Sequence, residues 1–313
     1  MQNKVKLITG ACGEIGQALI KQFKDDHVIS LDLEPFNSDY KFHKHFQGSI
    51  LDNILLDKIN NQYQITEIYH LAATLSTKAE KNPTFAKEVN IEGTNNLYNL
   101  CFSQIKQYNQ NVLFFFPSSI AIYNVSNINK IEIINEQKYC TNPTTVYGKS
   151  KLISEEKGQE YSDIYNKFDY RCIRFPGIIS SETIPSGGTS DYASEMLHAA
   201  ILNQDYSCFV NPTTILPFIV MPDAISAIIK LMNTPKNQLS IKVYNITSFS
   251  PAVKEIELEI KKYNSSFNMV YNIDDKRQKI VDSWPNLIDD SLAKDDWGWK
   301  AKYNFNDAFS NYI

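Results

Sequence analysis

The hydrophobic positions of the first 176 residues follow two alternating patterns. Short apolar runs of strand length recur, from Lys4–Thr9 at the start to Tyr170–Phe175 at the end. Between them lie longer stretches in which apolar residues return every three or four positions, as in helices that bury one face. This alternation predicts an α/β fold with a doubly wound, mostly parallel sheet and right-handed crossovers.

The predicted elements of this half follow one another in regular order. The strands are predicted at 4–9, 28–31, 43–46, 67–71, 112–116 and 170–175. The helices are predicted at about 15–24, 52–60, 81–108 and 146–166. Pro83 falls in the first turn of the third helix, where proline is tolerated.

After residue 176 the alternation becomes irregular. Helices are predicted at 191–202, 223–232 and 251–263, and strands at 214–220 and 242–246. We therefore predict a main domain over residues 1–176 and a smaller, mixed α/β lobe over residues 177–313. Segments of this lobe are expected to return to the main sheet.

Composition narrows the possible functions. The chain has 313 residues, 43% of them hydrophobic, which is enough for a large core. Lys and Arg total 31 against 35 Asp and Glu, and the absence of a basic block argues against a nucleic-acid partner. No apolar run approaches the ~18 residues of a membrane span, and no apolar signal region stands at the N-terminus. The five cysteines are scattered without metal-site spacing, so we expect no metal site and a reducing, cytoplasmic setting.

Three glycines mark the junction between the first strand and the first helix. Their spacing is Gly10-x-x-Gly13-x-x-Gly16, in the strand–turn–helix context that dinucleotide binding requires. Gly10 permits a tight turn, Gly13 lets the backbone approach a pyrophosphate, and Gly16 lets the helix pack closely on the strand. The helix N-terminus, at Glu14 and Ile15, would face the phosphates. We therefore predict that residues 1–176 form a Rossmann nucleotide-binding domain.

The residue that ends the second strand predicts which dinucleotide binds. Asp32 stands 22 positions after Gly10, where a carboxylate accepts both hydroxyls of the adenosine ribose and repels a 2′-phosphate. No arginine stands beside it, so the predicted cofactor is NAD. Further cofactor contacts are predicted at strand ends, where the chain comes closest to a dinucleotide: Leu33, Ser49, Ile50, Leu71, Ala72, Ala73, Pro176 and Ile178.

A tyrosine and a lysine four positions apart carry the candidate chemistry. On a helix Tyr147 and Lys151 share one face, and a lysine ammonium near a phenol lowers the pKa of the phenol toward working pH. Such a pair takes a proton from an alcohol. The same spacing arises by chance, as at Tyr40 and Lys44, where no helical pattern surrounds it. The wider pattern favours catalysis at the first pair, because Ser119 ends the preceding strand and its hydroxyl can reach the same crevice of a parallel sheet.

These residues together resemble the extended short-chain dehydrogenase/reductase family, which includes nucleotide-sugar epimerases and dehydratases. The resemblance lies in the glycine turn, His70-Leu71-Ala72-Ala73, Ser119 and the Tyr147–Lys151 pair. Here His70 is expected to pack at a strand end rather than to catalyse. Within the family the chain is most similar to the branch that oxidises L-threonine, from about residue 7 to residue 299. The segments that carry this similarity are 71–76, 117–121, 174–180, 185–193, 221–223, 282–285 and 297–299.

The resemblance implies an NAD-dependent oxidoreductase that converts the 3-hydroxyl of L-threonine to the ketone of 2-amino-3-oxobutyrate. It implies that Tyr147 takes the hydroxyl proton, that Lys151 holds the nicotinamide ribose and that Ser119 orients the alcohol. It also implies a homodimer formed through the helices that begin near residues 81 and 146.

One turn of the second half is a candidate for the substrate carboxylate. Gly187-Gly188-Thr189 precedes a predicted helix, so its N–H groups and hydroxyl are placed to receive an anion. Under the resemblance, Gly188, Thr189 and Ser76 hold the amino-acid end of the substrate. Trp284 is left without a role.

Two alternatives remain open. A nucleotide-sugar epimerase would use the same tyrosine and NAD in a larger site, although no paired basic residues for its pyrophosphate stand out. A catalytically silent NAD-binding regulator would need none of Ser119, Tyr147 and Lys151, which are all present.

Overall fold

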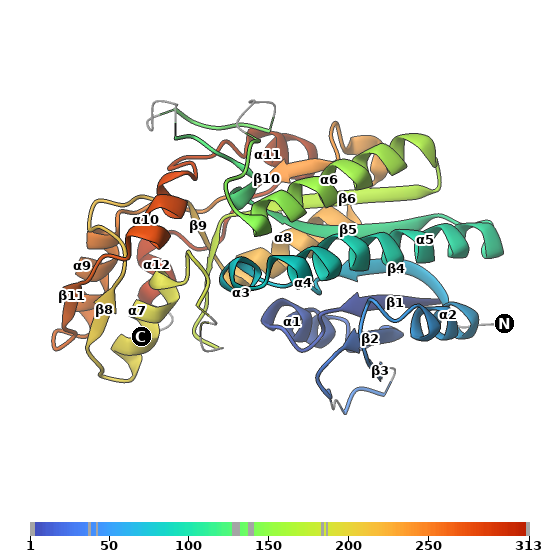
Figure 1. Ribbon diagram of the computed structural model, residues 1–313, viewed down its shortest axis with the longest axis horizontal. Coiled ribbons are helices and arrows are strands. Elements are labelled where there is room, and N and C mark those ends of the chain that lie inside the picture. The colour runs from blue at the N-terminus through green and yellow to red at the C-terminus, as the bar shows by residue number, and fades with distance from the viewer. Residues whose placement is uncertain are drawn as a thin grey trace.

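The structure of the protein is a computed structural model that describes residues 4–36, 39–41, 43–126, 132–136, 141–182, 185 and 187–310. Ser186, which belongs to one of the segments that carry the family resemblance, lies outside the described residues. Figure 1 shows a main body built on one large sheet and a smaller lobe beside it. Within the described part of the chain, no helix combines the length and hydropathy needed to cross a membrane.

Seven parallel strands form the main sheet, in the order β10-β6-β5-β4-β1-β2-β3. This order confirms the doubly wound prediction, because the chain starts at β1, winds out to one edge and then crosses to the other. The last strand of the sheet, β10, comes from beyond residue 176. The strands are β1 (Lys4–Thr9), β2 (Val28–Asp32), β3 (His43–Gln47), β4 (Gln64–His70), β5 (Val112–Ser119), β6 (Phe168–Phe175) and β10 (Val243–Asn245).

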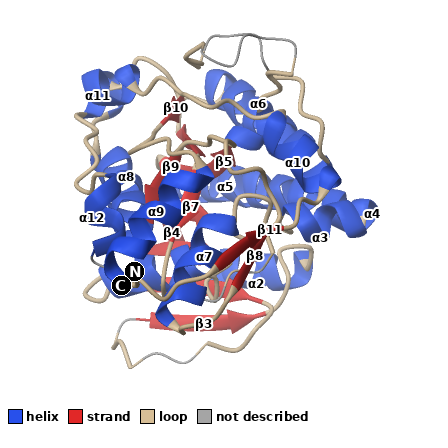
Figure 2. Cartoon of the chain, turned by 90° about the vertical axis from the view of Figure 1, so that its left-hand side faces the viewer, coloured by secondary structure: helices blue, strands red, loops and turns tan. Residues whose placement is uncertain are grey.

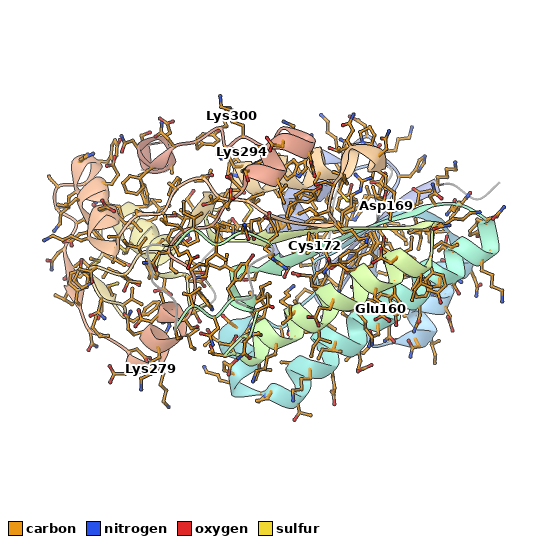
Figure 3. All side chains as sticks on the ribbon, turned by 90° about the horizontal axis from the view of Figure 1, so that it is seen from above. Glu160, Asp169, Cys172, Lys279, Lys294 and Lys300 are labelled. Atoms are coloured by element: carbon orange, nitrogen blue, oxygen red, sulfur yellow. The ribbon has the colours of Figure 1, made fainter. Side chains whose placement is uncertain are left out.

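Helices cover both faces of this sheet. Successive side chains of strand β5 therefore enter different cores. Phe114 and Phe116 pack in the core on one face of the sheet, and Phe115 packs in the core on the other face. Seen from above, Cys172 of β6 lies in the middle of the packed side chains (Figure 3) and is fully buried. The first face carries α2 (Asn53–Gln62), α5 (Thr94–Tyr108) and α6 (Val146–Ile164), and the second carries α1 (Glu14–Gln22), α8 (Met221–Asn233) and α11 (Ser291–Trp297).

The single helix predicted over residues 81–108 is wrong in detail. A separate helix ends before Asn82, because Pro83 disfavours a helical conformation in the residue that precedes it. Asn82 then caps the next helix by accepting the Phe85 N–H at 3.3 Å. The segments are α3 (Ser76–Lys81), α4 (Pro83–Lys87), a π-helical turn (Glu88–Gly93) and α5.

The smaller lobe stands beyond the carboxyl ends of the main strands, and Figure 2 shows it facing the viewer. The strand predicted at 214–220 is shorter than expected, since only Phe218–Val220 forms a strand and Pro217 before it has no N–H to donate. The lobe contains two small parallel pairs of strands, β11 with β8 and β7 with β9. The elements are β7 (Gly177–Ile179), α7 (Tyr192–Ile201), β8 (Tyr206–Cys208), β9 (Phe218–Val220), α9 (Val253–Tyr263), β11 (Met269–Tyr271), α10 (Asp275–Asp282) and α12 (Phe305–Ser310), with short 3₁₀ turns at Ile120–Ile122 and Lys236–Gln238.

Candidate active site

The predicted cofactor residues collect along one edge of the main sheet. Because its strands are parallel, their carboxyl ends share this edge, which is where open α/β sheets bind ligands. The residues follow the strands in turn: Gly10 after β1, Asp32 and Leu33 at the end of β2, Ser49 and Ile50 after β3, Leu71 to Ala73 after β4, Ser119 at the end of β5, and Pro176 and Ile178 after β6.

The glycine turn is closely packed against its neighbours. Gly10 has a φ of +70°, and a Cβ built on it would lie 2.5 Å from the Ala72 nitrogen. A Cβ on Gly16 would lie 2.5 Å from the Gly10 carbonyl oxygen. Gly13, the N-cap of α1, is less crowded, with the same carbonyl oxygen 3.3 Å from its ideal Cβ. Gly10 and Gly16 are therefore required by packing, whereas Gly13 leaves backbone open at the helix start.

Asp32 joins the glycine turn to the end of β2. One carboxylate oxygen accepts the Cys12 N–H at 2.9 Å, and the other accepts the Glu34 N–H at 3.1 Å. An ionised carboxylate has about four lone-pair sites, so these two bonds leave capacity for ribose hydroxyls. Burial, followed by the charges of Asp32 and Glu34, raises the pKa of the Cys12 thiol to about 11, so Cys12 remains a neutral thiol at pH 7.

The start of α1 also contacts the lobe. Glu14 and Ile15 are its first two residues, and the Glu14 carboxylate accepts a hydrogen bond from the Ser180 hydroxyl. The same hydroxyl accepts the Glu182 N–H at 3.2 Å, and the Ser180 N–H donates to Ser194 of α7 at 3.3 Å. The segment after β7 is therefore held against the predicted phosphate-binding turn.

His70 is a packed residue, as its sequence position predicted. Its Nδ1 lies 2.8 Å from the Thr9 hydroxyl and its Nε2 lies 2.9 Å from the Thr94 hydroxyl. Burial, with a smaller contribution from the charge of Lys151, lowers the pKa of the imidazole to about 3. The ring is therefore neutral and already hydrogen-bonded on both nitrogens.

The start of α6 is held against the end of β5. Thr145 caps the helix by accepting the Gly148 N–H at 3.0 Å. Gly148 packs so closely on the Ala121 carbonyl that no side chain fits there. The Ala121 N–H in turn donates to the Ser119 hydroxyl at 3.2 Å. These contacts bring Ser119 to the helix end that carries Tyr147.

Lys151 and Tyr147 share the predicted helix face. Their pKa values, however, differ from the prediction that the lysine lowers the pKa of the tyrosine. The Lys151 ammonium donates to the Pro117 carbonyl at 2.7 Å and lies 5.7 Å from the centroid of the Tyr147 ring. Burial lowers the pKa of Lys151 to about 8 and raises the pKa of Tyr147 above its ordinary value. The predicted lowering of the tyrosine pKa is thus not found, because loss of water penalises the phenolate and the ammonium is directed at a carbonyl.

Thr189 and Ser76, two predicted substrate-binding residues from distant segments of the chain, are in contact. The Thr189 N–H donates to the Ser76 hydroxyl at 3.4 Å, and both residues are buried. Gly188 lies beside them, with its N–H bonded to the Asp191 carboxylate at 2.6 Å. The turn of the lobe therefore lies against the start of α3, next to the end of β4.

Two residues that no sequence pattern singled out also hold this region together. Glu80 of α3 accepts the Val146 N–H at 2.6 Å, which ties α3 to the first residue of α6. Asn90 accepts the Thr74 N–H at 2.7 Å and donates to the Ser150 hydroxyl at 3.2 Å. Most of these partners lie 60 or more residues away in the chain, so no local signal marks the contacts.

Trp284 belongs to the core of the lobe. It is 4% exposed and packs in the cluster that includes Ile120 and Tyr123. Its indole N–H is buried and has no hydrogen-bond partner among the described residues.

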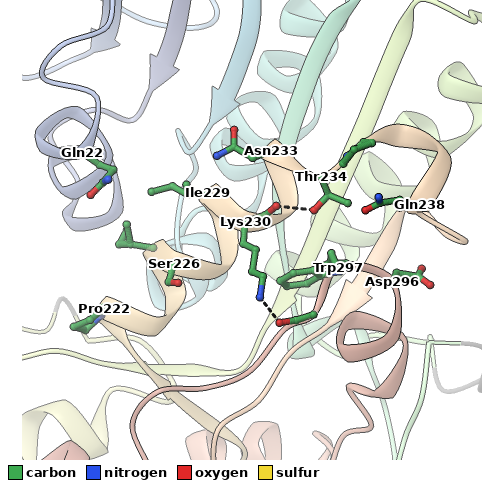
Figure 4. Close-up of a pocket in the computed structure, with 13 residues that line it drawn as sticks. Gln22, Pro222, Ser226, Ile229, Lys230, Asn233, Thr234, Gln238, Asp296 and Trp297 are labelled. Atoms are coloured by element: carbon green, nitrogen blue, oxygen red, sulfur yellow. Dashed lines mark hydrogen bonds between the residues drawn. The ribbon is translucent and has the colours of Figure 1, made fainter.

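A surface hollow of about 840 Å³ lies elsewhere, between α1, α8 and the end of α11 (Figure 4). Lys230 donates to the Gly298 carbonyl across it, and Thr234 donates to the Lys230 carbonyl at 2.8 Å. None of the predicted cofactor or substrate residues lines this hollow.

Known proteins resemble the chain over nearly its whole length. Residues 6–247 match the model of the NAD dependent epimerase/dehydratase family. The mitochondrial L-threonine 3-dehydrogenase of Bos taurus is 35% identical over 95% of this chain and 79% of its own length. A monomeric L-threonine 3-dehydrogenase of metagenomic origin has a TM-score of 0.88 and 39% identity, covering 98% of this chain and 97% of that one. The L-threonine dehydrogenase of Cupriavidus necator has a TM-score of 0.86 and 35% identity, covering 99% and 98%. The chain therefore belongs to the NAD-dependent epimerase/dehydratase family.

Proposed function

We propose that the protein oxidises the 3-hydroxyl of L-threonine to give 2-amino-3-oxobutyrate and NADH. The observation that carries this proposal is the contact between Thr189 and Ser76, which forms a small polar site beside the catalytic helix. Because Glu80 ties α3 to the start of α6, this polar site and Tyr147 belong to one connected arrangement. The similarity to several L-threonine dehydrogenases supports the same substrate.

In the proposed reaction, Tyr147 takes the proton of the substrate hydroxyl and Ser119 donates a hydrogen bond to the oxygen that becomes the ketone. Lys151 lies on the same helix face, where it would hold the nicotinamide ribose. The bound nicotinamide supplies the acceptor for the hydride that leaves C3. Burial raises the pKa of Tyr147, so the reaction should become faster as the pH rises.

The amino-acid end of threonine is proposed to bind at the turn of the lobe. The Thr189 N–H and the Ser76 hydroxyl meet there. We propose that these two groups and the Thr189 hydroxyl donate to the substrate carboxylate. The Thr189 to Ser76 bond is long at 3.4 Å, so a carboxylate is a stronger acceptor for the same donor. A Cβ on Gly188 would lie 2.5 Å from the Asp191 carboxylate, so no side chain fits at this position.

NAD is proposed as the cofactor in preference to NADP. The matching family binds a nicotinamide cofactor, and Asp32 supports the choice between the two forms. Its carboxylate stands at the end of β2, where it accepts the backbone N–H groups of Cys12 and Glu34, and a 2′-phosphate placed there would be repelled.

A homodimer formed through the helices of one face is also proposed. Apolar side chains on that face stay exposed, including Phe85 of α4 and Ile153 and Ile164 of α6. The mass of the protein in solution tests this proposal by distinguishing a dimer from a monomer. A monomer is the alternative outcome, because the similar metagenomic enzyme is monomeric. The division into domains at residue 176 and the cytoplasmic setting stay predictions.

NADH formation, followed by its absorbance, tests the proposed reaction. L-Threonine should give a signal, whereas D-threonine, threonine methyl ester and a UDP-sugar should give little, because each leaves buried donors unpaired or does not fit. Epimerisation forms no net NADH, so the UDP-sugar is assayed separately for its epimer by chromatography; formation of the epimer without NADH from threonine would replace the proposal with an epimerase. NADH binding without turnover of any substrate would instead favour a silent regulator.

A further inference from the structure

Two successive peptide units of the turn at Gly187–Thr189 are each held at both ends. In the first, Thr77 of α3 donates to the Gly187 carbonyl and the Gly188 N–H donates to Asp191 at 2.6 Å. In the second, Arg277 of α10 donates to the Gly188 carbonyl at 2.6 Å and the Thr189 N–H donates to Ser76 at 3.4 Å. A peptide unit is planar, so fixing its carbonyl also fixes the direction of its N–H.

The side chain of Arg277 is itself firmly placed. Its guanidinium lies 3.1 Å from the centroid of the Phe209 ring, which is buried after β8. Its Nε–H is buried without a partner among the described residues. The hydrogen bond to the Gly188 carbonyl therefore uses a cationic donor whose orientation the aromatic ring has already set.

We propose that Arg277 is a positioning residue for the substrate, one that holds the Gly188–Thr189 peptide so that its N–H and the Thr189 side chain face the amino-acid end of L-threonine. The inference rests on the proposed function and extends it to a residue that does not itself touch the substrate. Arg277 acts from the lobe, and Thr77 acts on the neighbouring peptide from α3 of the main body.

The turn needs such tethers because its own sequence leaves it free. Gly187 has a φ of +87°, and no atom lies within 4 Å of its ideal Cβ position. Glycine populates many backbone conformations at little cost, so without Arg277 the turn would sample other orientations of the Thr189 N–H. Threonine would then bind more weakly, while the chemistry at Tyr147 would change little once it is bound.

The test compares Arg277→Met and Arg277→Lys with wild type. Arg277→Met should raise the KM for L-threonine about tenfold, which is about 1.4 kcal/mol, with kcat within about threefold of wild type. The affinity for NADH should stay within about twofold, since the cofactor residues lie along the edge of the main sheet. Arg277→Lys should recover part of the loss, because an ammonium can still donate one bond but lacks the planar stack.

Lys279→Met is the matched control. Lys279 lies on the same helix, is exposed and projects from the outer side of α10 (Figure 3). It should leave the KM for threonine unchanged. Melting temperatures measured alongside report any general loss of structure.

Three results would overturn the role of Arg277: a threonine KM within twofold of wild type, an equal loss of NADH affinity, or an Arg277→Lys variant no better than Arg277→Met. If Arg277→Met does not fold, Thr77→Val tests the same turn from α3 and should raise the KM about three- to fivefold; an unchanged KM would count against the proposal. A wild-type protein that forms no NADH from threonine would instead overturn the proposed function itself.

Discussion

The proposed cofactor side and the proposed substrate side of the site each contain a glycine with positive φ, but the two glycines are held in opposite ways. Gly10 is crowded, since a Cβ there would lie 2.5 Å from the Ala72 nitrogen, so the packing of β1 against β4 defines its conformation. Gly187 has open space around it, and its turn is held by side chains from α3 and α10. The cofactor side is therefore set by close backbone packing, whereas the substrate side is set by tethers that single substitutions can remove.

This difference predicts that substitutions on the substrate side raise the KM for threonine without weakening NADH binding. The largest expected effect belongs to the chemistry itself. Tyr147→Phe removes the phenolic oxygen that is proposed to take the proton and should lower kcat by at least about 100-fold, the usual scale for a positioned acid–base group. NADH binding and the melting temperature should stay close to wild type, as checked by fluorescence titration and calorimetry. Near-normal turnover in this variant would remove Tyr147 from the mechanism.

The same difference explains which parts of the site the sequence predicts. Gly10, Gly13, Gly16 and Asp32 fall within 23 residues, and their spacing alone predicts the strand–turn–helix geometry that the structure contains. The tethers of the substrate turn join residues 110 and 89 positions apart, Thr77 with Gly187 and Arg277 with Gly188. No local periodicity encodes such contacts, so the sequence identified the turn but not what holds it.

Burial explains why the pKa of Tyr147 differs from the prediction. The sequence placed Tyr147 and Lys151 on one helix face, which the structure contains, but it carried no information on how deeply each ionisable group lies. The pKa of Tyr147 is therefore raised where the pair alone predicted a lowered value. The break at Asn82 was missed for a different reason, because proline is tolerated in the first turn of a helix, where the prediction placed Pro83.

Lys151 should make stability depend on pH in a defined window. Burial lowers its pKa from 10.5 to about 8, so between these values the unfolded chain holds the extra proton. The free energy of unfolding of the cofactor-free protein should therefore rise with pH across about 8 to 10.5, and below about 8 the cost of burying the charge is present in full. Lys151→Met removes this contribution, and the difference between the two proteins should change by about 2–3 kcal/mol across the window. Urea titrations at pH 7, 8, 9 and 10 would show it; parallel curves for the two proteins would mean that the lysine is not desolvated.

A smaller effect is expected at the end of β2. Wild type should use NAD at least about tenfold better than NADP, a difference of about 1.4 kcal/mol. Asp32→Ala should shrink this gap mainly by weakening NAD, because it removes the acceptor for the ribose hydroxyls while the glycine turn stays packed. Initial rates with each cofactor at saturating substrate measure the ratio. Equal use of both cofactors by wild type would show that Asp32 does not face the ribose.

The central claim, that the substrate side contributes to binding separately from the cofactor side, is tested most directly by the kinetics of Thr189→Ala. Losing one hydroxyl donor should raise the KM for L-threonine about three- to tenfold, on the scale of about 0.5–1.5 kcal/mol for one hydrogen bond. The NADH dissociation constant, measured on the same preparation, should not change. An unchanged threonine KM, or a matching loss of NADH affinity, would contradict the claim.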